Sequence, residues 1–198
     1  MSNITRRQIL QQLAAVIAAA GTITRVEAQQ VHQMTHLAIA AAGGTYKPNS
    51  LSAHEYKTLE HLTDLIIPVE KGAPGAALAE VAAWIDMLLS ANAELKQTYT
   101  KGLAWLDTAI EQRGAGDFIG ATVAQQKALL DLIAYRKNQT TELASAIEFF
   151  SLARRMTVDG FYTSRVGMPD IYLGNRVLPA FTVPAESLNY ALRRSGLG

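Results

Sequence analysis

The side chains best suited to chemistry in this chain are its four histidines, His32, His36, His54 and His61. His32 and His36 are four residues apart, the spacing at which two imidazoles on one helix face can bind the same metal ion. No Asp or Glu lies within that stretch, and the stretch reads as a connection rather than as a helix of the core. We therefore interpret both residues as solvated linker histidines and predict no metal site.

His61 and Asp64 are three residues apart and can pair on one face of a predicted helix. An acid–base dyad also needs a substrate pocket and a group that orients the imidazole. The sequence indicates neither, so we interpret the two residues as a structural pair. A stand-alone helical enzyme that uses His61 and Asp64 remains open as an alternative.

Other catalytic and cofactor motifs do not occur in the sequence. The neighbourhoods of Gly43, Gly114 and Gly174 lack both the phosphate-loop pattern and a preceding strand. Ser164 is not in the G-x-S-x-G elbow of a serine hydrolase. We predict no catalytic, cofactor-binding or metal-binding residues on this chain.

Cysteine is absent from all 198 residues. That excludes disulfides, thiolate nucleophiles, cysteine-ligated zinc, iron–sulfur clusters and covalently attached c-type haem. A formal net charge of +1 gives no indication of a nucleic-acid-binding surface. Any redox cofactor would have to be on a partner chain.

Residues 1–28 have the features of a bacterial export signal. Arg6 and Arg7 precede a mildly apolar run at 13–23, too short for the roughly 20 residues that span a bilayer. The arginine pair is similar to the twin-arginine consensus, and Val26-Glu27-Ala28 is an acceptable cleavage site. We expect periplasmic localisation through twin-arginine export. Membrane association would be indirect or would depend on an uncleaved signal.

The remainder divides into a linker at 29–50 and one domain at 51–198. The linker contains Gly43-Gly44 and Pro48, which are typical of turns and loops. Removal of residues 1–28, which contain three arginines and one glutamate, would leave a net charge of −1. The mature chain is therefore expected to be close to neutral.

Apolar residues at helical spacing predict an all-α fold, an irregular bundle of about five to six helices. Capping boxes at Ser52–Glu55 and Thr122–Gln125 mark two helix starts, and Pro68 ends the first of these helices. The predicted helices cover the region after Ser52, then 76–90, 94–112, 122–136 and 141–163, with a last short helix after Pro184. In the second helix, Leu78, Val81, Ala82, Ile85, Leu88 and Leu89 are expected to form one buried stripe.

The region after Ser164 is apolar but irregular, and rich in glycine, proline and aromatic residues. Such a segment must lie against a surface, because its backbone polar groups cannot be buried cheaply. We expect a long C-terminal segment that wraps over a surface.

Two groups of residues together resemble the gluconate 2-dehydrogenase subunit 3 family. The first comprises the helix end at 59–68, the Gly-Ala-Pro-Gly-Ala turn at 72–76 and the Ile-Asp helix at 81–86; the second comprises the aromatic–glycine residues at 160–164, Gly167 and 172–175. The resemblance covers about residues 50 to 180.

The resemblance implies a non-catalytic small subunit of a flavin-dependent dehydrogenase of sugars, sugar acids or glycosides. It implies that FAD is on a GMC-type flavoprotein large subunit, which the small subunit stabilises and accompanies through export. In many relatives a cytochrome c subunit takes up the electrons, so such a partner stays open. The other reading is a periplasmic helical binding or structural protein without a redox partner.

Aromatic anchors dominate protein interfaces, which makes the aromatic segment the expected contact with the flavoprotein. The candidate interface residues are Phe161, Tyr162, Tyr172, Gly174, Asn175 and Phe181. The alternative is that this segment wraps only its own helical bundle.

Overall fold

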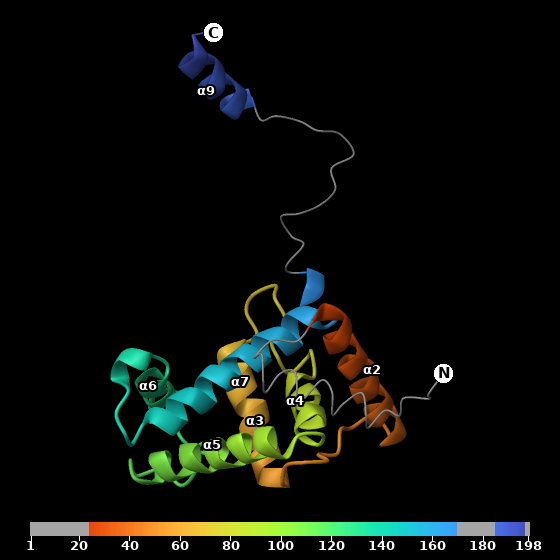
Figure 1. Cartoon of the computed structure of the whole chain (residues 1–198), viewed down its shortest axis with the longest axis vertical. Helices are drawn as coiled ribbons and strands as arrows, with labels where there is room; N and C mark the ends of the chain where they lie inside the picture. The colour runs from red at the N-terminus through yellow and green to blue at the C-terminus, as the bar shows by residue number, and fades with distance from the viewer. Residues whose placement is uncertain (1–23, 170–184, 197–198) are drawn as a thin grey trace.

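A computed structural model describes residues 24–169 and 185–196, and the regular elements in these ranges are helices (Figure 1). They are α2 (Arg25–Ala41), α3 (Ala53–Ile66), α4 (Val81–Leu89), α5 (Ala93–Glu111), α6 (Val123–Ile133), the 3₁₀ helix η1 (Arg136–Asn138), α7 (Ala144–Thr163) and α9 (Ala185–Ser195). In the described part of the chain, extended pairing is limited to one isolated bridge between Glu70 and Ala73. The all-α prediction is confirmed. The aromatic, glycine- and proline-rich segment at 170–184 lies outside the described residues.

Helix α7 is the element against which the others are arranged. It contacts α2, α3, α4, α5 and α6, with α6 near its amino end and α2 near its carboxyl end (Figure 1). Helix α4 lies inside this arrangement, and every residue from Val81 to Leu89 is buried, as expected for a helix that is apolar nearly all round. Gly160 lets α7 approach α4 closely, because a Cβ atom there would lie 3.0 Å from the Trp84 ring.

The predicted helix starts at Ser52 and Thr122 are confirmed. Ser52 accepts a hydrogen bond from the Glu55 backbone while the Glu55 carboxylate accepts one from the Ser52 backbone, and Thr122 and Gln125 repeat the pattern. The apolar residues at helical spacing in α5 are also buried; they are Leu95, Tyr99, Leu103, Leu106 and Ile110. Local capping chemistry and 3.6-residue periodicity are therefore sufficient to identify these helices.

The predicted helix at 76–90 begins five residues too early. Residues 76–80 form turns, and Glu80 adopts a left-handed conformation with φ of 54° immediately before α4. Leu78 is consequently 67% exposed instead of belonging to the buried stripe. The apolar pattern continues through this turn, so periodicity alone does not show that the helix begins at Val81.

Helix α2 occupies most of the region predicted to be a linker. Its buried residues are Ala28, Val31, His32 and Thr35, which face α4 and α7. Because two of these four are polar and one is only a methyl group, hydropathy does not reveal the helix. The boundary at residue 28 falls within the first turns of α2, and Ala28 itself is fully buried.

Among the helices of the described ranges, none combines the length and the apolar character needed to cross a bilayer.

Candidate functional site

The end of α3, the turn that follows it and the end of α7 enclose a groove of about 240 Å³. We call it the Pro68 groove; its lining residues are Ile66, Ile67, Pro68, Glu70, Ala73, Pro74, Phe161 and Tyr162. Its two walls are far apart in the sequence. They belong to the two groups of residues on which the family resemblance rests.

The turn that forms one wall is held by its own backbone. Glu70 and Ala73 exchange two hydrogen bonds of 3.1 and 3.0 Å, and Gly72 between them has a φ of 86°, which favours glycine. A Cβ atom at Gly75 would lie 2.8 Å from the Val69 backbone nitrogen and 3.0 Å from the Ile67 carbonyl oxygen. The glycines of the Gly-Ala-Pro-Gly-Ala sequence are therefore required by the shape of this turn.

The chain after the turn is fastened to α3. The Ala77 N–H donates to Asp64 Oδ1 at 2.8 Å, and the Ala76 N–H donates to the Ile67 carbonyl at 2.9 Å. Two large aliphatic side chains face solvent, Val69 before the turn at 74% and Leu78 after it at 67% exposure. Both side chains are accessible to a binding partner.

The other wall of the groove is the last turn of α7. Phe161 is 2% exposed and meets the half-buried Tyr162 edge to face, with ring centroids 5.0 Å apart. Ser164 Oγ donates to the Phe161 carbonyl and accepts from the backbone N–H groups of Val166 and Gly167. These hydrogen bonds end the helix and fold the chain back against Phe161.

The structure describes two of the six predicted interface residues, Phe161 and Tyr162, and both line the Pro68 groove. Phe161 is too deeply buried to contact a partner directly and instead supports Tyr162. Tyr172, Gly174, Asn175 and Phe181 lie outside the described residues, as do Arg6 and Arg7 of the predicted export signal.

Asp86, of the Ile-Asp pair in the resemblance, anchors the chain that precedes α3. Its buried carboxylate accepts hydrogen bonds from the Tyr46 hydroxyl and from the backbone N–H groups of Asn49, Ser50 and Leu51, over 2.7–3.2 Å. Burial and then the Asp86 charge raise the pKa of Tyr46 well above its usual range. The sequence analysis did not assign this role to Asp86. A single carboxylate within an otherwise apolar helix indicates a buried acid with hydrogen-bond partners.

The expected pairing of His61 with Asp64 is wrong. Asp64 is hydrogen-bonded to the Ala77 backbone, whereas the His61 ring meets Phe118 edge to face at 6.0 Å and its buried Nε2 has no hydrogen-bond partner. Asp64 binds the chain that follows the Pro68 turn, whereas His61 packs against Phe118, so the two side chains have different partners.

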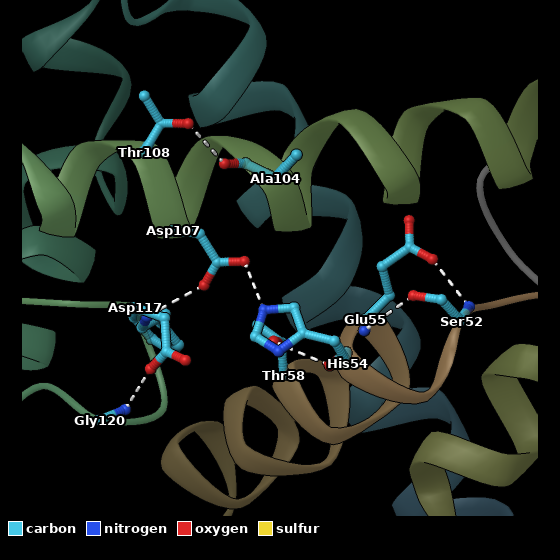
Figure 2. Close-up of polar contacts among 10 residues, drawn as sticks. Ser52, His54, Glu55, Thr58, Ala104, Asp107, Thr108, Asp117 and Gly120 are labelled. Atoms are coloured by element: carbon cyan, nitrogen blue, oxygen red, sulfur yellow. Dashed lines mark hydrogen bonds and ion pairs between the residues drawn. The ribbon is translucent and has the colours of Figure 1, made fainter.

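A different histidine–carboxylate pair joins α3 to α5 (Figure 2). His54 Nε2 lies 2.8 Å from Asp107 Oδ2, and Asp107 Oδ1 accepts from the Phe118 N–H at 2.9 Å. The hydrogen bond to Asp107 raises the pKa of His54. The nearby hydroxyls of Thr58 and Thr108 both donate hydrogen bonds to carbonyl groups of their own helices, so neither hydroxyl donates to the His54 ring. This pair is suited to linking two helices rather than to acid–base catalysis.

The remaining histidines, His32 and His36, have different environments. His32 is 8% exposed, so the expectation of a solvated linker histidine is wrong for it. His36 is largely exposed and lies 3.0 Å from a Glu80 carboxylate oxygen. In the described ranges, no three His, Cys, Asp or Glu side chains come together as metal ligands.

A larger pocket of about 420 Å³ lies between α2, α3 and the start of α4. Tyr46 and Tyr56 contribute aromatic walls, and Glu60, Asp64 and Glu80 contribute carboxylates. Burial raises the pKa of Glu60. Asp64 and Glu80 already have partners in the Ala77 N–H and His36, so the carboxylates chiefly support the local structure.

Comparison with known proteins gives one match. The model of the family described as gluconate 2-dehydrogenase subunit 3 matches residues 53–179, which is more than half of the chain and includes both walls of the Pro68 groove. No curated protein and no solved structure matches the chain.

Proposed function

The chain belongs to the gluconate 2-dehydrogenase subunit 3 family, and from that membership we propose that it is the non-catalytic small subunit of a heteromeric flavin-dependent dehydrogenase. The family identifies an accessory subunit of a dehydrogenase complex. The finer proposal is that a GMC-type flavoprotein large subunit holds FAD and oxidises a sugar, sugar acid or glycoside. A cytochrome c subunit would accept the electrons.

The observation that supports this proposal is the composition of the Pro68 groove. Its walls come from two distant segments of the family match, and their positions depend on backbone contacts at Gly75 and Gly167 that only glycine allows. Beside them, Val69 and Leu78 are exposed. A preformed surface of this kind loses little conformational entropy when a partner binds.

In this proposal the partner binds over the Pro68 groove and along the aromatic segment that follows α7. A stable interface of this type buries about 800 Å² on each partner, more than the groove alone offers. Tyr162 and the two exposed aliphatic residues, Val69 and Leu78, would be the central contacts. Tyr172 and Phe181 would extend the contact beyond the described residues.

The second part of the proposal concerns export. The twin-arginine pathway moves folded proteins, so a small subunit with Arg6 and Arg7 can accompany a flavoprotein that has already bound FAD. The complex would then act in the periplasm, with any membrane association provided by another subunit or by an uncleaved signal.

Co-purification tests the interface. The tagged chain is co-expressed with a GMC-type flavoprotein from the same host, and the flavin absorbance recovered with the tag is measured. The double variants Val69→Asp/Leu78→Asp and Tyr172→Ala/Phe181→Ala are each expected to lose most of the flavin. Val123→Asp, an exposed position on α6, is the matched control. Undiminished flavin recovery with both double variants would contradict the proposed interface.

Export is tested by fractionation. Replacing Arg6 and Arg7 by lysine is expected to retain both the chain and the flavoprotein in the cytoplasm, whereas replacing Arg25 by lysine leaves both in the periplasm. Periplasmic flavoprotein in the Arg6→Lys/Arg7→Lys strain would refute joint export.

A further inference from the structure

Helix α2 is held to the rest of the molecule around His32. The His32 ring stacks on Trp84 of α4, with centroids 5.7 Å apart and planes 30° apart. Its Nε2 lies 3.2 Å from Thr163 Oγ1 on the last turn of α7. One side chain therefore touches both helices against which α2 packs.

The hydrogen bond to Thr163 requires a proton on His32 Nε2, which the neutral and the doubly protonated ring can both carry. The Thr163 hydroxyl donates to the Asp159 carbonyl, so its oxygen is available to His32 as an acceptor. Nε2–H supplies the matching donor. A second proton would place a full charge on a ring that is 8% exposed, and burying a charge without an opposite partner is costly.

Among the described residues, no carboxylate pairs with the ring, and burial outweighs the Gly160 backbone hydrogen bond that favours the charged form. On α2, His36 repels a charged His32, and Glu80 at the start of α4 already pairs with His36. On α7, burial raises the pKa of Asp159, which favours its neutral form, and Arg155 is cationic. The described ion pairs of the chain do not include His32.

The other contacts of α2 include the ion pair between His36 and Glu80 at the start of α4. Trp84 Nε1 donates to the Ala28 carbonyl at 3.2 Å, and Gln29 Nε2 approaches Met168 Sδ at 3.7 Å. Ala28 and Val31 are fully buried, and Met34 and Ala38 pack against the core with part of their surface exposed. A charge on His32 would act directly on the packing of α2 against Trp84 and Thr163.

We propose that His32 is a pH-sensitive latch: a second proton on its ring releases α2 from Trp84 and from the last turn of α7. Release would uncover Trp84, Gly160 and Thr163, immediately before the aromatic segment. The latch is a property of this chain alone and does not depend on the proposed partner.

The direction of the pH dependence follows from linkage. Burial lowers the pKa of His32 to about 4 in the docked state, whereas an exposed ring has a pKa near 6.5. Between these values the released state binds more protons, so docking weakens as the pH falls from about 6.5 to 4 and does not weaken further below that. The docking equilibrium shifts by up to about 300-fold over this range.

Tryptophan fluorescence tests the latch in the full chain. The sequence contains two tryptophans, so Trp105→Phe leaves Trp84 as the only reporter. We expect a red shift and a loss of intensity between pH 6.5 and 4, with the helical circular dichroism of the bundle retained. In the same background, His32→Gln keeps a donor for Thr163 but cannot titrate, and its emission is expected to stay constant.

His36→Gln is the matched control, and it is expected to retain the transition because His36 is outside the buried contact. Hydrogen exchange of the peptide covering 25–41 provides a second measurement, independent of whether His32→Gln folds. In the parent chain this peptide is expected to lose protection at low pH, after correction for the intrinsic rate, while a peptide from α5 does not. Three results would each overturn the latch: no emission change, a transition that persists in His32→Gln, or equal loss of protection in α5.

Discussion

Single polar side chains position much of the irregular backbone in this protein. Asp86 binds three consecutive backbone N–H groups and the Tyr46 hydroxyl from within α4, and so holds the stretch at 46–51 that leads into α3. Asp64 holds the chain after the Pro68 turn in the same manner through Ala77. Both acids belong to the resemblance pattern, and their roles are structural.

Asp86→Ala is expected to lower the free energy of unfolding by about 3 kcal/mol or more, because it leaves several buried donors without an acceptor. Urea denaturation measures the loss. Asp131→Ala, at an exposed position on α6, is the control and is expected to change stability by less than about 0.5 kcal/mol. Equal stabilities of the two variants would show that Asp86 does not hold residues 46–51.

The His54–Asp107 pair predicts a pH dependence opposite to that of His32. The hydrogen bond to Asp107 raises the pKa of His54 in the folded state. Its stabilising effect is therefore complete below the unfolded value near 6.5 and is lost as the pH rises through the higher folded value. Titration of the His54 ring by NMR should show a midpoint above 6.5 that falls in Asp107→Asn and not in Asp131→Asn. An unchanged midpoint in Asp107→Asn would rule out the pair in solution.

Among the elements, the α3–turn–α4 unit determines the shape of the candidate interface. Pro68 ends α3, the bridge between Glu70 and Ala73 closes the turn, and the left-handed Glu80 starts α4. The exposed positions of Val69 and Leu78 follow from this geometry. The exposure of these two side chains therefore depends on the α3–turn–α4 unit as a whole.

Gly75→Ala tests the turn. The new methyl group would meet backbone atoms of Val69 and Ile67, which cannot move without opening the turn. We expect a loss of about 1–3 kcal/mol in urea denaturation and weaker recovery of the flavoprotein. Gly116→Ala is the matched control, since a Cβ atom there meets nothing within 4 Å. If both variants behave alike, the turn tolerates the contact.

At the scale of the whole molecule, α7 unites the bundle and places distant segments together. It contacts five other helices of the described ranges (Figure 1). Its carboxyl end meets α2 through His32 and the Pro68 turn through Tyr162. Helix α9 is different, because none of its residues is buried. Leu188 and Tyr190 are among its exposed side chains.

Removal of residues 185–198 is therefore expected to change the free energy of unfolding of the bundle by less than about 0.5 kcal/mol. Chemical denaturation of the full and shortened chains measures this difference. Leu188→Asp in the full chain is expected to be equally neutral. A loss of about 1 kcal/mol or more in both variants would demonstrate that α9 packs on the bundle.

Several elements could be predicted from local sequence because local chemistry forms them. The Ser52 and Thr122 caps are completed within four residues, and the buried apolar residues of α5 recur at helical spacing from Leu95 to Ile110. Helix α2 could not be found in this way, because its buried face includes His32 and Thr35. The start of α4 was also missed, since Leu78 fits the apolar period although it lies in a turn.

The sequence by itself determined the helical class, the capped helix starts, the turn glycines and the pattern that identifies the family. Only the tertiary structure decided which of several similar residues are buried: His32 but not His36, Val81 but not Leu78. It also decided that Asp64 binds a backbone amide instead of His61, and that two distant segments line one groove. The physical reason is that burial and hydrogen-bond choice depend on neighbours from other helices, whereas caps and turns depend on neighbours in the chain.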